Sequence, residues 1–92
     1  MMKAVGLIEL SSVAAGFEVA DTMLKAAEVD LILSRTICAG KFMVIIGGEV
    51  AAVSAAVEAG LQVWEGAVID SMVIPNVHPG VFPAIAGSVA PA

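Results

Sequence analysis

Two strand–helix–strand segments follow one another in this chain, and a short turn joins them. Apolar runs typical of buried strands cover Lys3–Leu10, Val29–Ile37, Lys41–Ile46 and Val68–Ile74. Between the first two runs, and again between the last two, apolar residues recur at helical spacing. The order β-α-β-β-α-β predicts a ferredoxin-like fold of the mixed α/β (α+β) class. We expect one antiparallel sheet with both helices on one face.

The first helix is expected to begin after Ser11-Ser12, because serine is a common N-cap. Asp21 and Lys25 stand in the i,i+4 order that stabilises a helix. Gly16 costs about 1 kcal/mol relative to alanine inside a helix, and a close contact with the sheet would explain it. The apolar spacing of four and three residues predicts a buried face, which consists of Val13, Phe17, Ala20, Leu24 and Ala27.

The second helix is expected to open at Gly47-Gly48-Glu49, with the carboxylate near the positive end of the helix dipole. Gly66 is expected to end it. Its predicted buried face consists of Val50, Val53, Val57, Leu61 and Trp64. Its predicted solvent face consists of Ser54, Glu58, Gln62 and Glu65.

The turn between the two halves, Cys38-Ala39-Gly40, holds the only cysteine of the chain. Gly40 can supply the positive φ of a tight turn. One cysteine can neither close a disulfide within its chain nor hold a metal cluster alone, so neighbouring subunits would have to supply further ligands. The nearby Lys41 favours the thiolate that metal binding requires. The alternative is that Cys38 is an inert, packed thiol.

The composition indicates a chain whose surface is covered by partners. Its 92 residues suit one domain, residues 1–92, with a folded core at about 3–78 and a tail at 79–92. Hydrophobic residues make up 60% and charged residues 14%, against roughly 45–50% and 25% in ordinary soluble domains. The sequence therefore predicts oligomerisation. Part of the open sheet face is expected to be covered by the tail from Val77, through Val81, Phe82 and Ile85.

Several function classes are disfavoured. No apolar run of about 20 residues is free of both charges and prolines, so we expect no membrane span and no membrane partner. A net charge of −5 disfavours nucleic acid as a partner. Without CxxC, HExxH or a Ser-His-Asp set, we expect no enzyme. Glu9 and Asp70 are interpreted as edge or interface charges rather than an acid–base pair, and His78 as a tail residue. The free thiol suits a reducing cytoplasm.

Several segments together resemble the bacterial microcompartment shell domain. Ala4-Val5-Gly6-Leu7-Ile8-Glu9 resembles the opening strand of that family, and Ala20–Val29 resembles its first helix, including the edge lysine. Gly47–Val53 resembles the start of its second helix, and Val73-Ile74-Pro75 with His78 resembles its closing strand. The resemblance covers Ala4 to about His78.

This resemblance implies a non-enzymatic shell protein in a compartment of the bacterial cytoplasm. Its partners would be five further copies of itself, in a flat homo-hexameric disc, and other shell proteins that tile with it. The turn would line a central pore through Ile37, Cys38, Ala39 and Gly40. Lys25 and Asn76 would lie at the inter-disc edge, with Asn76 where many relatives have an arginine.

The stretch from Arg35 to Phe42 is similar to one subgroup, the first domain of the tandem-domain shell protein of propanediol-utilisation compartments. The resemblance implies a [4Fe–4S] cluster shared between subunits, with Cys38 as the only residue that matches as a metal ligand. In that subgroup three subunits supply the thiols, whereas a six-fold ring would present six.

Two other function classes remain open at this point. A ferredoxin-like fold also suits a small-molecule-binding regulatory module, which would be a monomer or a dimer. A small enzyme with Cys38 as nucleophile is the other class, although the sequence offers no base to pair with it.

Overall fold

In the part of the chain that the structure describes, four strands and two helices follow one another in the predicted order. The structure, a computed structural model, describes residues 3–38 and 40–77. The elements are β1 (Ala4–Leu10), α1 (Val13–Ala26), β2 (Asp30–Cys38), β3 (Lys41–Gly48), α2 (Val50–Val63), the 3-10 turn η1 (Glu65–Ala67) and β4 (Val68–Ile74). The predicted β-α-β-β-α-β order is therefore confirmed. The expected tail cover falls on residues that lie outside the described part.

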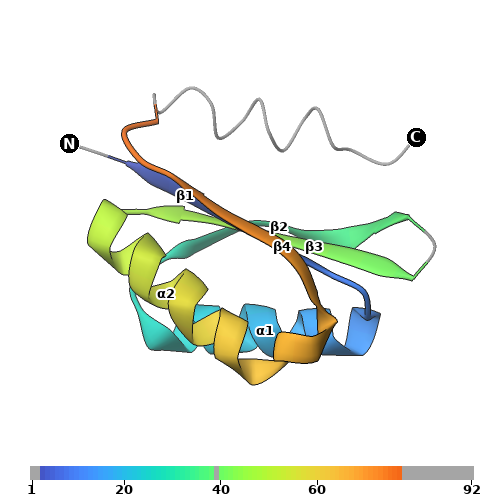
Figure 1. Cartoon of the computed structure of the whole chain (residues 1–92). Coiled ribbons are helices and arrows are strands. Elements are labelled where there is room, and N and C mark those ends of the chain that lie inside the picture. The colour runs from blue at the N-terminus through green and yellow to red at the C-terminus, as the bar shows by residue number, and fades with distance from the viewer. Residues whose placement is uncertain (1–2, 39, 78–92) are drawn as a thin grey trace.

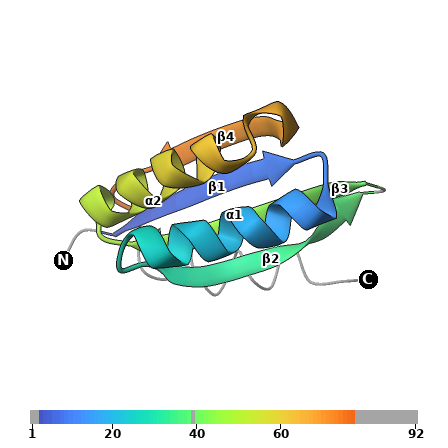
Figure 2. The same ribbon diagram turned by 90° about the horizontal axis from the view of Figure 1, so that it is seen from below.

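The sheet has the strand order β2-β3-β1-β4, and every neighbouring pair is antiparallel. Each βαβ half is split by a strand of the other half, which is the ferredoxin-like arrangement. Figure 1 shows α1 and α2 on the same side of this sheet, and Figure 2 shows them lying next to each other across it. Both expectations for the sheet are confirmed. Among the described residues, no helix has the length and hydropathy needed to cross a bilayer.

The core lies between the helices and the alternate residues of β1. Ile8 and Leu10 are fully buried on this face, and burial of a side chain of this size contributes roughly 1.5–3 kcal/mol. Gly6 lies on the same face. A Cβ added there would come within 2.6 Å of Val57 and 2.8 Å of Val53, which are both on α2. Glycine at this position therefore lets α2 pack directly on the middle of β1.

One close contact sets the position of α1 over β3. A Cβ at Gly16 would lie 2.1 Å from Cδ2 of Phe42, so only glycine allows the helix to rest on this ring. Phe42 is 3% exposed, and the ring of Phe17 packs on it with the two centroids 5.4 Å apart. The expected reason for a glycine inside the helix, a close contact with the sheet, is confirmed.

The predicted buried face of α1 is wrong in most positions. Val13, Phe17 and Leu24 are 37%, 64% and 40% exposed, and only Ala20 of the predicted set is buried. The helix is apolar on more than one side, so two different sets of residues have the spacing of four and three that indicates a buried face. The stripe with the smallest side chains lies closest to the sheet because it permits the closest approach. The buried residues of α1 are Ala15, Gly16, Val19, Ala20 and Met23.

The ends of α2 also differ from the prediction. Gly47 and Gly48 belong to β3, where Gly48 pairs with Ala4, because β1 continues to offer backbone partners. Glu49 is the N-cap. The helix ends at Val63, before the expected stop at Gly66. Trp64, the C-cap residue, is 47% exposed rather than buried, and its Nε1–H donates a hydrogen bond to Glu18 of α1 at 2.6 Å.

Replacing Gly16 with alanine is expected to destabilise the protein by roughly 1–3 kcal/mol, because the new methyl group overlaps the Phe42 ring. Gly66→Ala is the matched control: a Cβ there meets nothing within 4 Å, and the change should stay within about 0.5 kcal/mol. Urea unfolding of both variants measures the difference. Equal stability of Gly16→Ala and Gly66→Ala would show that the helix does not rest on this ring.

Candidate functional site

The candidate site is the end of the β2–β3 hairpin, which Figure 1 shows extending past the helices at the right of the view. The ladder pairs Thr36 with Phe42 and Cys38 with Lys41, with an irregularity between these pairs. Cys38 is therefore the last residue of β2, rather than part of the turn as expected. Gly40 has φ 76°, which confirms the expected positive φ. The buried Phe42 ties the base of this hairpin to α1.

Three of the four predicted pore residues are brought together at this end. Ile37 is half-buried, Cys38 ends its strand, and Gly40 is exposed. Ala39 falls outside the described residues. A Cβ at Gly40 would meet nothing within 4 Å, so the chain itself does not fill the space around the turn. The end of the hairpin can therefore accept contacts from another molecule.

Lys41 places a positive charge at the tip of the hairpin, whereas two other lysines are in ion pairs. Lys3 lies 4.0 Å from Glu49, and Lys25 lies 2.9 Å from Asp21, which confirms the predicted i,i+4 pair. Lys41 is exposed, and within the described ranges no carboxylate lies within ion-pair distance of it. The chain as a whole has a net charge of −5. The Lys41 ammonium, which has no carboxylate beside it in the described residues, therefore makes the hairpin tip a locally favourable position for anionic groups.

A single chain does not provide a complete metal site in the part that the structure describes. No group of three or more His, Cys, Asp or Glu side chains lies close enough together there to hold a metal ion. An iron–sulfur cluster is held by several thiolates, and each chain has one cysteine. The donor type at Cys38 therefore fits such a cluster only if several copies of the hairpin meet.

The two predicted edge residues lie at the opposite end of the sheet from the hairpin tip. Lys25 is in the last turn of α1, which ends just before β2 begins. Asn76 follows β4, and the backbone N–H of the next residue, Val77, donates to the carbonyl oxygen of Lys3 at 2.8 Å. Asn76 has φ 58°, a left-handed conformation that asparagine tolerates better than most residues. Tip and edge residues are therefore separated by the length of the strands.

The structure also brings together two carboxylates that no pattern in the sequence relates. Glu9 on β1 and Asp70 on β4 are directly opposite partners in the antiparallel ladder. One Asp70 oxygen accepts a hydrogen bond from the N–H of Ser71 at 2.8 Å. The pair belongs to the regular register that runs from Val5–Ile74 to Glu9–Asp70, and the ladder becomes irregular only after it, between Glu9 and Leu10.

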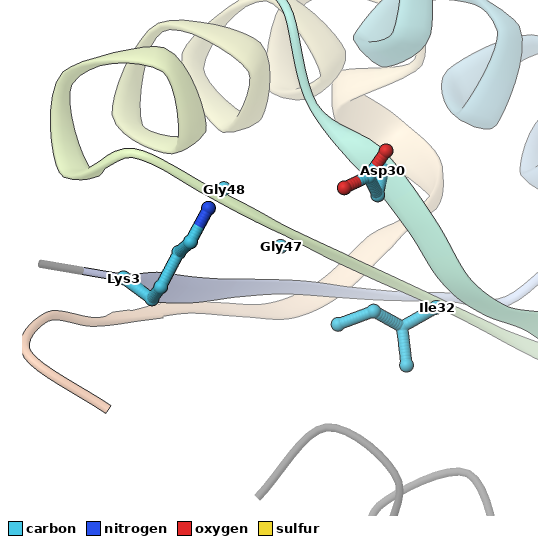
Figure 3. Close-up of a pocket in the computed structure, with 5 residues that line it drawn as sticks. All are labelled: Lys3, Asp30, Ile32, Gly47 and Gly48. Carbon is cyan, nitrogen blue, oxygen red and sulfur yellow. The ribbon is translucent and has the colours of Figure 1, made fainter. Parts of the chain in front are cut away.

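A small cavity lies at the end of the sheet far from the hairpin tip. Its volume is about 270 Å³, just below the usual range of roughly 300–1,000 Å³ for ligand pockets. Figure 3 shows Lys3 reaching along the glycine-bearing end of β3, with Asp30 and Ile32 contributed by β2. Two of its five lining residues, Gly47 and Gly48, offer no side chain, so it gives little support to a small-molecule module.

Comparisons with known proteins agree with this geometry. Residues 4–77 match the family model of the BMC domain. The chain is 47% identical, over 95% of its length, to the bacterial microcompartment shell protein PduT of Citrobacter freundii. It is 39% identical, over 85% of its length, to the carboxysome shell protein CcmK2 of Synechocystis. A crystal structure of a microcompartment protein from Desulfitobacterium hafniense superposes with a TM-score of 0.91 at 46% identity over the whole chain.

These relatives differ in length. The chain spans 47% of PduT and 51% of the protein in the crystal structure, but 80% of CcmK2. The match to the first two therefore concerns about half of each protein.

Gly40→Ala is expected to lower the free energy of unfolding by roughly 1–2 kcal/mol, because φ 76° is unfavourable for an L side chain. Gly40→Asn should lose less, since asparagine visits this region more readily. Urea unfolding midpoints of the two variants give the comparison. An alanine variant as stable as the wild type would contradict the left-handed turn.

Proposed function

The chain belongs to the BMC domain family, and from this premise we propose that it is a structural subunit of a bacterial microcompartment shell. The matches to shell proteins from two kinds of compartment support this role. Its place would be in a shell inside the bacterial cytoplasm, with other shell proteins as partners. No catalytic role is part of this proposal.

The distribution of exposed apolar side chains supports assembly into a ring. Phe17, Leu24 and Leu31 lie on α1 and β2, at one edge of the sheet. Ile69, Met72 and Ile74 lie on β4, the strand at the opposite edge. Two different patches on opposite edges suit a head-to-tail interface, and such an interface closes into a ring when the rotation allows it.

The ring that we propose is a homo-hexamer with the β2–β3 hairpins at its axis. The hairpin extends past the helices, and the space around Gly40 is free for neighbouring copies. Ile37, Cys38, Ala39 and Gly40 would then line a central pore. Lys25 and Asn76, at the other end of the sheet, would lie toward the inter-disc edge.

A second part of the proposal concerns a cofactor at this axis. Symmetry would repeat Cys38 around the pore, so the ring could supply the several thiolates that an iron–sulfur cluster needs. Such a cluster, of the [4Fe–4S] type, would carry one electron at a time through the shell. Lys41, the register partner of Cys38, would offset part of the negative charge of the thiolates.

Leu24→Asp is expected to shift the protein from six times the chain mass toward one chain, because burying an unpaired carboxylate costs roughly 3–5 kcal/mol. Leu24 is 40% exposed, so the substitution should leave the folded chain intact. Ser54→Asp adds the same charge to the exposed side of α2 and should leave the mass unchanged. Analytical ultracentrifugation provides the readout. A wild-type monomer or dimer would refute the ring and favour the regulatory module.

Cys38→Ser is expected to remove all bound iron and the associated visible absorbance while leaving the hexamer mass unchanged. The reason is that iron–sulfur clusters are held by thiolates, and a serine hydroxyl, which is not ionised at neutral pH, is a much weaker ligand. Iron assay and electron paramagnetic resonance after anaerobic reconstitution measure the loss. Wild-type protein that stays colourless and iron-free would rule out the cluster and leave the ring proposal standing.

A further inference from the structure

A row of side chains with charged ends crosses the sheet on the side that points away from the helices. Arg35 on β2 is the register partner of Met43 on β3. Met43 is in turn opposite Glu9 on β1, which is opposite Asp70 on β4. Side chains alternate along β1 and Gly6 faces α2, so Glu9 and its partners point away from the helices. The row therefore has a cation at one edge of the sheet and two carboxylates toward the other.

The two carboxylates repel each other within one chain. Directly opposite residues of an antiparallel pair have Cβ atoms roughly 4.5–5.5 Å apart, and like charges there are destabilising. Asp70 is exposed and Glu9 is half-buried, and in the described ranges neither lies within ion-pair distance of a lysine or an arginine. One Asp70 oxygen accepts the N–H of Ser71, and a carboxylate has a second oxygen that can bind a cation. The β4 edge therefore favours a cationic partner from outside the chain.

The cation at the other end of the row suits this role. Arg35 is half-buried on the edge strand β2, and its Nε–H donates to the carbonyl oxygen of Thr36 at 3.4 Å. A guanidinium has five N–H donors, so it can keep local hydrogen bonds and still bind a carboxylate. Arginine also suits ion pairs at interfaces, because its donors match the two oxygens of a carboxylate.

Cyclic symmetry would bring the two ends of this row together. Rotation about the axis of a ring changes neither the distance of an atom from the axis nor its height along the axis. With the hairpins at the axis, the β2 edge of one subunit lies beside the β4 edge of the next. Arg35 and Asp70 lie at one level along the strands and on one side of the sheet. The Arg35 of a neighbouring subunit would therefore arrive beside Asp70.

We propose that Arg35 of each subunit binds the Asp70 and Glu9 carboxylates of the next copy of the same chain. The inference rests on the proposed ring and adds an electrostatic contact that sets which edges meet and in what register. Exposed Leu31 on β2 and exposed Ile69 on β4 provide apolar groups on the same two strands, as at interfaces with an apolar core and a polar rim. Assembly also relieves the repulsion between Glu9 and Asp70.

Charge reversal tests the inference. Asp70→Arg and Arg35→Glu should each raise the concentration at which half of the ring dissociates by at least about tenfold, because like charges then meet at every interface. Glu58→Arg makes the same change of charge on the exposed side of α2 and should leave this concentration unchanged. Analytical ultracentrifugation over a dilution series provides the measurement. A ring that tolerates both reversals would overturn the inference and leave the ring itself standing.

Mixing the two variants separates contact between subunits from contact within one chain. A ring that alternates Asp70→Arg chains with Arg35→Glu chains pairs opposite charges at every interface. An equimolar mixture should therefore recover most of the wild-type stability of the ring, and so should a chain that carries both reversals. Rescue by the doubly substituted chain without rescue by the mixture would place the ion pair within one chain and overturn the inference.

Milder substitutions keep the test decisive if a reversed variant fails to fold, which circular dichroism would reveal. Asp70→Asn and Arg35→Gln should each weaken the ring several-fold, and the chain with both changes should be no weaker than either alone, because they remove the same contact. Fully additive losses would overturn the inference. A wild-type chain that is a monomer or dimer would overturn the ring together with this contact, and it is thereby distinguished from failure of the contact alone.

Discussion

The contact between Gly16 and Phe42 is the constraint on which the candidate site depends. The helix α1 can rest on β3 only because Gly16 has no side chain, and the ring of Phe42 fills the space beneath it. Phe42 is also the residue at the base of the hairpin, one position after Lys41. The same contact therefore fixes both the height of the helix above the sheet and the point from which the hairpin tip extends.

The unusual composition of the chain is explained by where its apolar residues lie. A chain with 60% hydrophobic residues has more of them than one small core between two helices and a sheet can bury. The excess lies on the outer side of α1, at the end of α2 and on β4. Each of these surfaces lies at an edge or on an open face of the sheet. Such apolar surfaces favour contacts with other protein surfaces.

The sequence alone was sufficient for the order of elements, since each strand is an apolar run bounded by turn residues. It was also sufficient for the helix cap at Ser12, whose Oγ accepts a hydrogen bond from the N–H of Ala15. It did not identify the buried face of α1, because that helix is apolar on several sides. The pairing of Glu9 with Asp70 was not predictable either, since these strands are about 60 residues apart in the chain and no turn links them to fix the register.

For the site, the apolar pattern predicted the hairpin and its residues, and the family resemblance suggested that the turn lines a pore. The contact between the hairpin tips of several subunits was not predictable from the pattern of one chain, because it lies between molecules. Because the chain has one cysteine, spin labels on Cys38 measure the distances between the hairpin tips of different subunits directly. Spin labels on Cys38 should report shorter distances between subunits than labels on a Lys25→Cys variant that also carries Cys38→Ser. Distances at Cys38 as long as those at position 25 would contradict a ring with its hairpins at the axis.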